Sequence, residues 1–293
     1  MRATSHVFRW IGRHGPVLLL MVLAAASPAI GASPRPPVRL TQSAALPNSG
    51  AGLDFYKIET EAATYYLEKY GAALASMIDR EGHDWISFRS QSGSRAAGEF
   101  RGFPNAVHGQ TPGYFHPRNQ NTGEAVTKVE RAGPERVTIS AVSGGGLWAC
   151  RYDFLPTHCT FTMTKMPPEQ KYWVLYEGTP GGSYDDTDWW MTSAVKQPQA
   201  MTVNHEGDIP APEWIAFGDP KLKRVIFLLH HEDDQHPDRF YQMDRQMTVF
   251  GFGRMRGEKH LATVPRQFSI GFLETTAHAE IGRAMEKFGK QAQ

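Results

Sequence analysis

The feature that most limits the fold of this 293-residue chain is a succession of short aromatic and β-branched runs separated by turn residues. Long helical patterns do not alternate with these runs, as they would in a doubly wound α/β protein. Only the C-terminal tail is typical of a helix, because Ile281, Met285 and Phe288 fall on one face. Thr275 or Thr276 can cap that helix.

This pattern predicts an all-β fold, a large antiparallel β-sandwich with long loops on one face and a C-terminal helix. About 260 residues follow residue 32, enough to bury one large core, and a single all-β domain of this size is ordinary. The expected strands span residues 55–60, 64–70, 74–79, 84–88, 136–142, 147–154, 159–165, 172–177, 214–217, 224–229, 247–252 and 267–273.

The N-terminus has the pattern of a secretory signal peptide. Arg2, Arg9 and Arg13 precede a short apolar stretch at residues 17–26, and small residues follow it. We therefore expect a signal peptide at 1–32, a flexible leader at 33–52, a single β-sandwich domain at 53–293, and export to the periplasm or the extracellular space. The apolar stretch is too short to span a bilayer, so no integral membrane anchor is expected after cleavage.

The near-neutral net charge of the chain argues against nucleic acid and anionic membranes as partners. Without the three arginines of residues 1–32, 28 of the 31 basic residues remain against 30 acidic ones. This balance gives no basic surface for nucleic acid or for an anionic membrane. The oligomeric state stays open.

Two cysteines, Cys150 and Cys159, lie in an expected hairpin that turns at residues 155–158. If the turn centres on Pro156 and Thr157, Cys159 faces Phe154 rather than Cys150. The two Cα atoms would then be too far apart for a disulfide, although an exported protein could form one. The geometry therefore favours two free thiols.

Residues 230–236 are dense in imidazoles and carboxylates and directly follow an apolar run at 225–229, a predicted buried strand. Such groups are costly to bury unpaired, so they must face water, each other, a metal or a substrate. Strand alternation puts His230 and Glu232 on one face. We expect this segment to form one wall of a cleft whose other wall is the loop at 101–116. A solvated polar loop is the alternative.

Residues 89–124 lose periodicity but keep Gly, Pro and aromatic residues, and a long ordered loop often carries function. The alternative is an Ω-like loop that satisfies its own backbone. Guanidinium groups bind carboxylates, amides bind hydroxyls, and imidazoles exchange protons near neutrality. The candidate residues here are Arg101, Asn105, His108, Tyr114 and His116.

A second irregular segment, residues 178–188, is rich in Gly and Asp and follows a predicted strand ending at Glu177. Its Gly-Gly pair would let the backbone approach a ligand closely. Glu177, Tyr184 and Trp189 are the candidate substrate-binding residues. A tight turn followed by a solvated acidic loop is the other interpretation.

Residues 66–86 resemble the opening of galactose-mutarotase-like domains: a strand, the step Gly71-Ala72, a short strand, then Asp79-x-x-Gly82 and another strand. Such domains are β-supersandwiches that bind carbohydrate. The resemblance implies a carbohydrate partner and a site near the Arg101–His116 loop. The same fold hosts lyases, hydrolases, epimerases and non-catalytic modules, so it does not choose the reaction.

The residues favour an exported polysaccharide lyase, because proton abstraction beside a uronate carboxylate needs a neutraliser, a base and an acid. Arg101 and Asn105 would bind the carboxylate, and His108 or His116 would take the proton. The proton donor would be Tyr114 or Tyr184. His230 and Glu232 would orient the base or complete the cleft.

Other functions remain open. A hydrolase would pair Glu177 with Asp185 or Glu232, and an epimerase on the same fold is a further alternative. A non-catalytic periplasmic carbohydrate-binding module would expose Tyr184, Trp189 and Trp190 as a platform. No cofactor is required, although a divalent metal could bind His230 and Glu232 together with His108 or His116.

Overall fold

The computed structural model describes residues 37–46, 52–90, 97–108, 115–118 and 124–291, all within one compact unit that spans residues 35–293. The expected signal peptide lies outside the described residues, as does Tyr114. Part of the expected leader is described, and its residues Arg39–Ala44 form strand β1. No helix among the described residues is long and apolar enough to cross a membrane.

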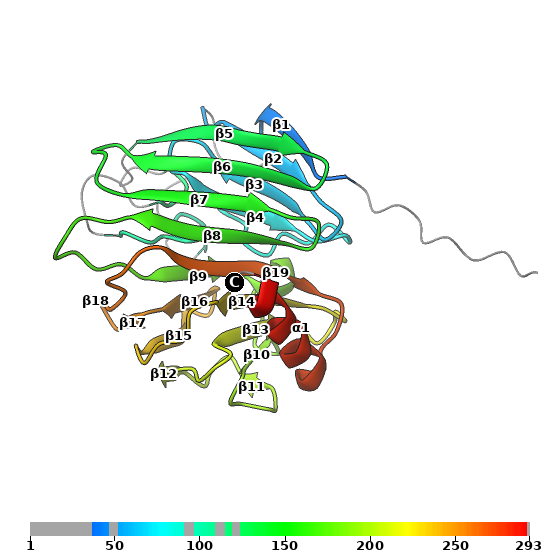
Figure 1. Ribbon diagram of the computed structural model, residues 1–293. Helices are drawn as coiled ribbons and strands as arrows, with labels where there is room; N and C mark the ends of the chain where they lie inside the picture. Colours follow the sequence, from blue (N-terminus) through cyan, green and yellow to red (C-terminus); the bar gives the residue numbers. More distant parts are fainter. Residues whose placement is uncertain (1–36, 47–51, 91–96, 109–114, 119–123, 292–293) are drawn as a thin grey trace, which may run out of the picture. The chain divides into compact units, whose positions relative to one another are not determined.

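Three antiparallel sheets and a two-stranded ribbon make up this unit, which confirms the all-β expectation (Figure 1). The sheets have the orders β1-β2-β3-β4, β11-β10-β13-β14-β19-β8-β7-β6-β5 and β12-β15-β16-β9, and β17 pairs with β18. The strands are β1 Arg39–Ala44, β2 Phe55–Glu59, β3 Thr64–Glu68, β4 Ala73–Ile78, β5 Ala125–Gly133, β6 Arg136–Ser143, β7 Ala149–Phe154, β8 His158–Lys165, β9 Val174–Gly178, β10 Trp189–Thr192, β11 Gln199–Ala200, β12 His205–Gly207, β13 Trp214–Gly218, β14 Val225–His230, β15 Asp238–Met243, β16 Met247–Phe252, β17 Arg254–Met255, β18 Glu258–Lys259 and β19 Arg266–Leu273.

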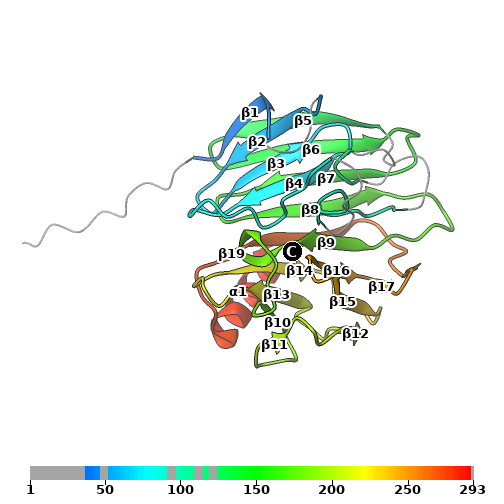
Figure 2. The ribbon, with the colours of Figure 1, turned by 180° about the vertical axis from the view of Figure 1, so that it is seen from behind.

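Each of the two four-stranded sheets packs against part of the nine-stranded sheet (Figures 1 and 2). Tyr65 of β3 meets Phe154 of β7, with ring centroids 5.3 Å apart. Phe217 of β13 meets Phe240 of β15 at 5.4 Å. Burying apolar surface stabilises by roughly 25 cal/mol per Å², so these interleaved aromatic faces hold the sandwich together.

Helix α1, His278–Gln291, packs on the nine-stranded sheet as its apolar stripe predicted (Figure 1). Ile281 and Met285 are fully buried, and the ring of Phe288 stacks on Phe227 of β14 with centroids 5.3 Å apart. The hydroxyl of Thr275 accepts a hydrogen bond of 3.1 Å from the amide of Ala277, which ties down the start of the helix.

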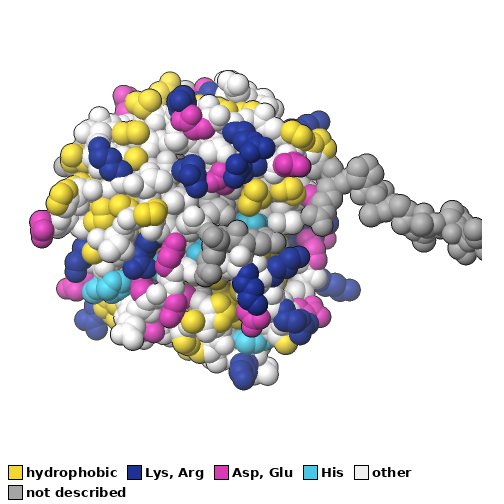
Figure 3. All heavy atoms as spheres, in the orientation of Figure 1, with side chains coloured by type: hydrophobic (Ala, Val, Ile, Leu, Met, Phe, Trp, Pro, Cys, Tyr) yellow, Lys and Arg dark blue, Asp and Glu magenta, His cyan; other side chains and the backbone are white. Residues whose placement is uncertain are grey.

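The β7–β8 hairpin has the register that the sequence predicted. Phe154 pairs with Cys159, and Cys150 pairs with Met163. Both cysteines are free and buried. On the face shown in Figure 3, cationic and anionic side chains are interspersed, as expected for a nearly neutral chain.

Candidate functional site

A cavity of ≈ 210 Å³ opens on the sheet β12-β15-β16-β9, and we call it the Glu177 cavity. Strand β9, the residue before it, strands β15 and β17, and the segments 97–108 and 115–118 supply its walls. The lining residues are Phe100, Asn105, His108, His116, Trp173, Leu175, Glu177, Tyr241, Met243 and Arg254.

The segment around Gly102 is attached to β9 in the manner of an extra strand. The amide of Gly102 donates to the carbonyl of Glu177 at 2.8 Å, and the amide of Glu177 donates back at 3.0 Å. The amide of Leu175 donates to Pro104 at 2.7 Å. These paired backbones place the Asn105 side chain beside that of Glu177.

Glu177 lies at the centre of the polar chemistry of this cavity. Its side chain shares the cavity face of β9 with Leu175, whereas the intervening Tyr176 packs against Phe217 in the core. Only 5% of Glu177 is exposed, and burial raises its pKa to about 7, although a hydrogen bond from Asn105 and the charge of Arg254 oppose the rise. A carboxyl group with this pKa can take up or release a proton near neutral pH.

One wall of the cavity is cationic and aromatic. The Arg254 guanidinium lies 4.9 Å from the ring centroid of Trp173 and 5.2 Å from that of Tyr241, whose hydroxyl accepts a bond of 3.2 Å from Nη2. Nη1 of Arg254 is buried and has no hydrogen-bond partner within the described part of the chain. Behind this wall and outside the cavity lining, the ammonium of Lys259 lies 4.7 Å from the Trp173 centroid and donates to the carbonyl of His108. This wall therefore suits an anionic group.

The two predicted imidazoles of the loop differ in their surroundings. The ring of His108 stacks on Trp173 with centroids 6.4 Å apart, and burial followed by the charges of Lys259 and Arg254 lowers its pKa. His116 lies 2.8 Å through Nδ1 from the Pro117 carbonyl and 3.0 Å through Nε2 from the Phe100 carbonyl. Burial lowers the pKa of His116 to about 4, so a neutral ring there donates only one of these bonds and serves to hold the loop.

Three other predicted residues lie outside the lining. Arg101 is buried and donates through Nη2 to the carbonyl of Gln246 at 3.1 Å. Trp189 belongs to β10, where its ring lies over Gly218 so closely that a Cβ there would come within 2.2 Å of it. Tyr184 is half-buried beside the acidic residues that follow it. The site residues that the sequence did not single out are Phe100, Trp173, Leu175, Tyr241, Met243 and Arg254.

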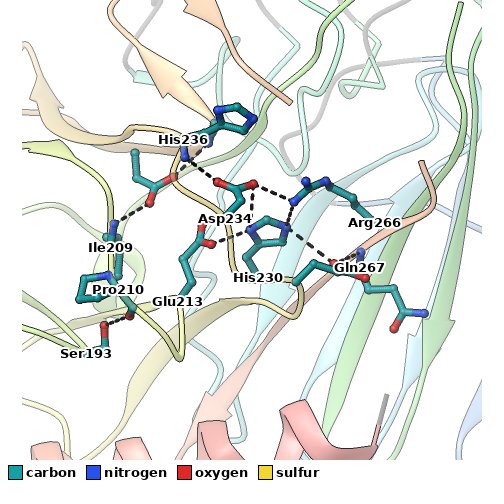
Figure 4. A network of polar contacts seen from close by, with 12 residues as sticks. Ser193, Ile209, Pro210, Glu213, His230, Asp234, His236, Arg266 and Gln267 are labelled. Atoms are coloured by element: carbon teal, nitrogen blue, oxygen red, sulfur yellow. Dashed lines mark hydrogen bonds and ion pairs between the residues drawn. The ribbon is translucent and has the colours of Figure 1, made fainter. Parts of the chain in front are cut away.

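His230 and Glu232 also lie outside this lining, in a separate network (Figure 4). His230 Nδ1 is 2.8 Å from Glu213 Oε2, and its Nε2 accepts from Arg266 at 3.2 Å. Arg266 also donates to Asp234 at 2.7 Å. Glu232 accepts a bond of 2.8 Å from the backbone amide of Gln267.

Burial sets the protonation of this network. It lowers the pKa of His230 well below its usual range, and together with neighbouring carboxylates it raises the pKa of Glu213. His230 is thus neutral and donates from Nδ1 while it accepts at Nε2. Glu213, His230 and Asp234 bring potential ligand atoms within 4.8 Å of one another, but Arg266 already supplies a positive charge to Asp234. Neither of the two three-residue groups of this kind among the described residues includes His108 or His116.

Comparison with solved structures shows the fold. HI1317 superposes with a TM-score of 0.53 at 12% identity, covering 80% of this chain and 99% of its own. YeaD of Salmonella typhimurium, described provisionally as a mutarotase, gives 0.50 at 12% identity, covering 81% of this chain and 96% of its own. A galactose-mutarotase-related enzyme from Lactobacillus acidophilus gives 0.47 at 10% identity, over 76% of this chain and 99% of its own.

The chain therefore has a galactose-mutarotase-like β-sandwich, as residues 66–86 predicted. No protein-family profile matches it, and no curated protein sequence matches it. At this identity the likeness concerns the fold, so the roles of individual residues must come from the geometry of this chain.

Proposed function

We propose that the chain is a carbohydrate-active enzyme that transfers protons on an acidic sugar held in the Glu177 cavity. The observation that carries this proposal is the buried Glu177 carboxyl group, whose pKa of about 7 suits acid–base catalysis. The carbohydrate-related fold supports a sugar as substrate. The Arg254 guanidinium in the cavity wall supports a sugar that carries a carboxylate or a similar anion.

Elimination on a uronate-containing carbohydrate is the reaction that best uses these groups. Arg254 would bind the uronate carboxylate, and Glu177 would take the proton from C5. The C–H electron pair would then form the C4–C5 double bond while the C4–O4 bond breaks. Tyr241, whose oxygen already accepts from Arg254, has its own hydroxyl hydrogen free to donate to the leaving oxygen.

His108 is the second candidate base, because it lines the same cavity and its lowered pKa keeps it neutral at pH 7. The elimination proposed here thus keeps the lyase chemistry expected from the sequence. It moves the neutraliser from Arg101 to Arg254, since Arg101 does not line the cavity. It also moves the base from His108 or His116 to Glu177. The proton donor becomes Tyr241 in place of Tyr114 or Tyr184.

Epimerisation at the anomeric carbon is the second candidate reaction, and the fold that this chain shares with YeaD favours it. Glu177 would accept the proton of the anomeric hydroxyl, and Tyr241 or His108 would protonate the ring oxygen as the ring opens. This reaction needs only one sugar unit, which fits a cavity of ≈ 210 Å³ that is smaller than the roughly 300–1,000 Å³ of typical ligand pockets.

Two alternatives have less support. Glycoside hydrolysis uses a carboxylate pair about 5–9.5 Å apart, whereas Glu177 is the one carboxylate among the described residues that line the cavity. A binding module with a Trp platform is disfavoured because Trp190 is 97% buried, donates to the carbonyl of Val203 and packs on Phe240.

The test compares the full-length protein with Glu177→Gln on two substrate sets. Uronate polymers and oligomers are followed by the absorbance of the unsaturated product, and free uronic acids, sugar phosphates and neutral sugars by proton NMR of anomer exchange. We expect one set to react and the variant to lose about 10²–10⁴-fold in rate. The proposal is rejected if the wild type shows no activity in either assay, or if Glu177→Gln is fully active.

Export is a proposal as well, supported by the basic and apolar pattern of residues 1–32. N-terminal sequencing of the protein recovered from the periplasm or medium of an expressing bacterium tests it. Recovery of the chain solely in the cytoplasm with Met1 intact would contradict it.

A further inference from the structure

Three carboxylates outside the Glu177 cavity converge on one point. Asp185 and Asp188 lie between the short helix η2, Pro180–Gly182, and strand β10. Asp219 follows strand β13, which pairs with β10 so that Trp189 faces Gly218. This register puts Asp188 and Asp219 side by side, and one ligand oxygen from each of the three aspartates lies within 4.8 Å of the others.

The convergence takes place in a buried environment. Asp188 is 99% buried and Asp219 94% buried. Oδ2 of Asp188 accepts a bond of 3.0 Å from the amide of Asp185, but its Oδ1 is buried without a partner among the described residues. Such an orphaned carboxylate oxygen is unfavourable unless a donor or a cation reaches it.

The three carboxylates of this cluster also have less positive charge near them than their own negative charge. Burial and the nearby Asp185 and Asp219 carboxylates raise the pKa of Asp188 to about 8. Lys221 supplies one ammonium group, which pairs with Asp185. Gly181 lies so close to Asp219 that a Cβ there would come within 2.4 Å of Oδ2, so the backbone of this loop covers one side of the cluster.

We propose that Asp185, Asp188 and Asp219 form a binding site for a calcium ion. An all-oxygen donor set suits a hard cation. Ca²⁺ takes six to eight oxygen ligands at about 2.3–2.6 Å in flexible geometry, whereas Mg²⁺ demands near-ideal octahedral geometry at about 2.0–2.1 Å. The three ligand oxygens, which lie within 4.8 Å of one another, are close enough to share one ion after small side-chain adjustments, and such an irregular set favours Ca²⁺. Water and backbone carbonyls would complete its coordination.

The ion would neutralise the mutual repulsion of three carboxylates that two neighbouring segments bring together. It would tie the loop after Glu177, which begins at Thr179, to the end of β13 at Asp219. Lys221 would have to give up its contact with Asp185 or share it, so the ammonium group competes with the ion. Calcium binding is thus expected to stabilise the fold, independently of the reaction in the Glu177 cavity.

The experiment uses the full-length protein, stripped of divalent ions with a chelator. Calcium chloride is titrated in by isothermal calorimetry, and Tm is measured with and without the metal. We expect one site with a Kd no weaker than about 10⁻³ M, the range of weak extracellular calcium modules, and a higher Tm in calcium than in magnesium.

Four variants locate the site. Asp188→Asn and Asp219→Asn should each weaken binding at least about tenfold, because each removes a charged ligand. Lys221→Met should bind calcium more tightly than the wild type, because it removes the competing cation. Asp186→Asn changes an exposed carboxylate of the same loop that pairs with Arg245, and should bind normally.

Two outcomes overturn the proposal. One is the absence of saturable calcium binding by the wild type up to millimolar concentration. The other is wild-type affinity in both Asp188→Asn and Asp219→Asn, since the ion would then bind elsewhere. If Asp188→Asn does not fold, Asp219→Asn and Lys221→Met decide the question, because they must change the affinity in opposite directions.

Discussion

Nδ2 of Asn105 lies 2.7 Å from Oε2 of Glu177, although 72 residues separate them in the chain. The amide donates to the carboxylate and so favours its ionised form, against the effect of burial. The backbone pairing between Gly102 and Glu177 fixes the two side chains relative to each other. Asn105 is therefore a positioning residue that sets how readily Glu177 gives up its proton.

Replacing Asn105 by Gly tests this role. Asn105 has a φ of +42°, which Gly tolerates without strain, so Asn105→Gly removes the amide and keeps the backbone. Without that donor the pKa of Glu177 should rise above about 7, and the acid limb of the pH profile of kcat/KM should move to higher pH. Asn204→Gly, at an exposed asparagine, is the control. An unmoved acid limb would mean that the hydrogen bond does not tune Glu177.

The pH dependence of stability gives a test of Glu177 that needs no substrate. Its folded pKa of about 7 exceeds the ordinary value of 4.5, so the stability that the protonated group contributes is complete below pH 4.5 and is lost as the pH rises through 7. At about 1.4 kcal/mol per pKa unit, this loss is about 3 kcal/mol.

Glu177→Gln should lack that loss, since its amide is neutral at every pH. Denaturant unfolding at pH 4.5 and pH 8 should therefore show the wild type falling by about 3 kcal/mol relative to the variant. Glu286→Gln, on the exposed side of α1, controls for the removal of a carboxylate. A constant difference between wild type and Glu177→Gln at the two pH values would contradict a raised pKa.

Local sequence patterns predicted much of the fold, because many strands of this sandwich are short aromatic and β-branched runs bounded by turn residues. A turn centred on Pro156 and Thr157 predicted even the β7–β8 register that separates Cys150 from Cys159. Residues 84–88 were expected as a strand and are not one. The Asp84 carboxylate instead accepts bonds from the amides of Met77, Ile86 and Ser87, and the segment turns.

The site was harder to predict because its walls meet only in three dimensions. Asn105, His108, His116 and Glu177 were singled out by sequence and line one cavity. Arg254 was missed, since it lies on the short β17–β18 ribbon, which only the fold brings to the cavity. Residues 230–236, in contrast, were assigned to the site from their sequence but do not line the cavity. Glu213 and Arg266, the partners of His230, lie 17 and 36 residues away from it, so this dense motif belongs to an internal network of hydrogen bonds and ion pairs.

Arg254 should control affinity for the anionic group of the substrate. Arg254→Met keeps an unbranched side chain against Trp173 and Tyr241 but loses the guanidinium. A hydrogen bond to a charged group contributes about 1.5–3 kcal/mol, so KM for the acidic substrate should rise roughly 10–200-fold. The methyl ester of that substrate should be affected little, and Arg283→Met on the exposed side of α1 should leave both unchanged. Equal losses on acid and ester would assign Arg254 a packing role.

Arg224 should contribute to stability rather than to catalysis. Its guanidinium is 95% buried and lies 3.2 Å from the fully buried carboxylate of Asp79, with Glu81 at 3.0 Å and Glu274 at 3.2 Å. Arg224→Met leaves Asp79 buried without its counter-charge, which costs about 3–5 kcal/mol. Urea unfolding measures the loss. The double variant Arg224→Met, Asp79→Asn should recover part of it, and no recovery would mean that the ion pair is not the cause.

The thiols of Cys150 and Cys159 should not react with thiol reagents in the folded protein. Cys150 is 99% buried and Cys159 fully buried, and burial raises the pKa of both well above the usual thiol value, so little reactive thiolate forms at neutral pH. Ellman's reagent should titrate neither in native buffer and both in denaturant without reductant.

A reductant should leave Tm unchanged, because no disulfide contributes to stability. Protein refolded under oxidising conditions is the control for a bridge formed after purification. Fewer than two thiols in denaturant would show that Cys150 and Cys159 had left the register of the β7–β8 hairpin in at least part of the population.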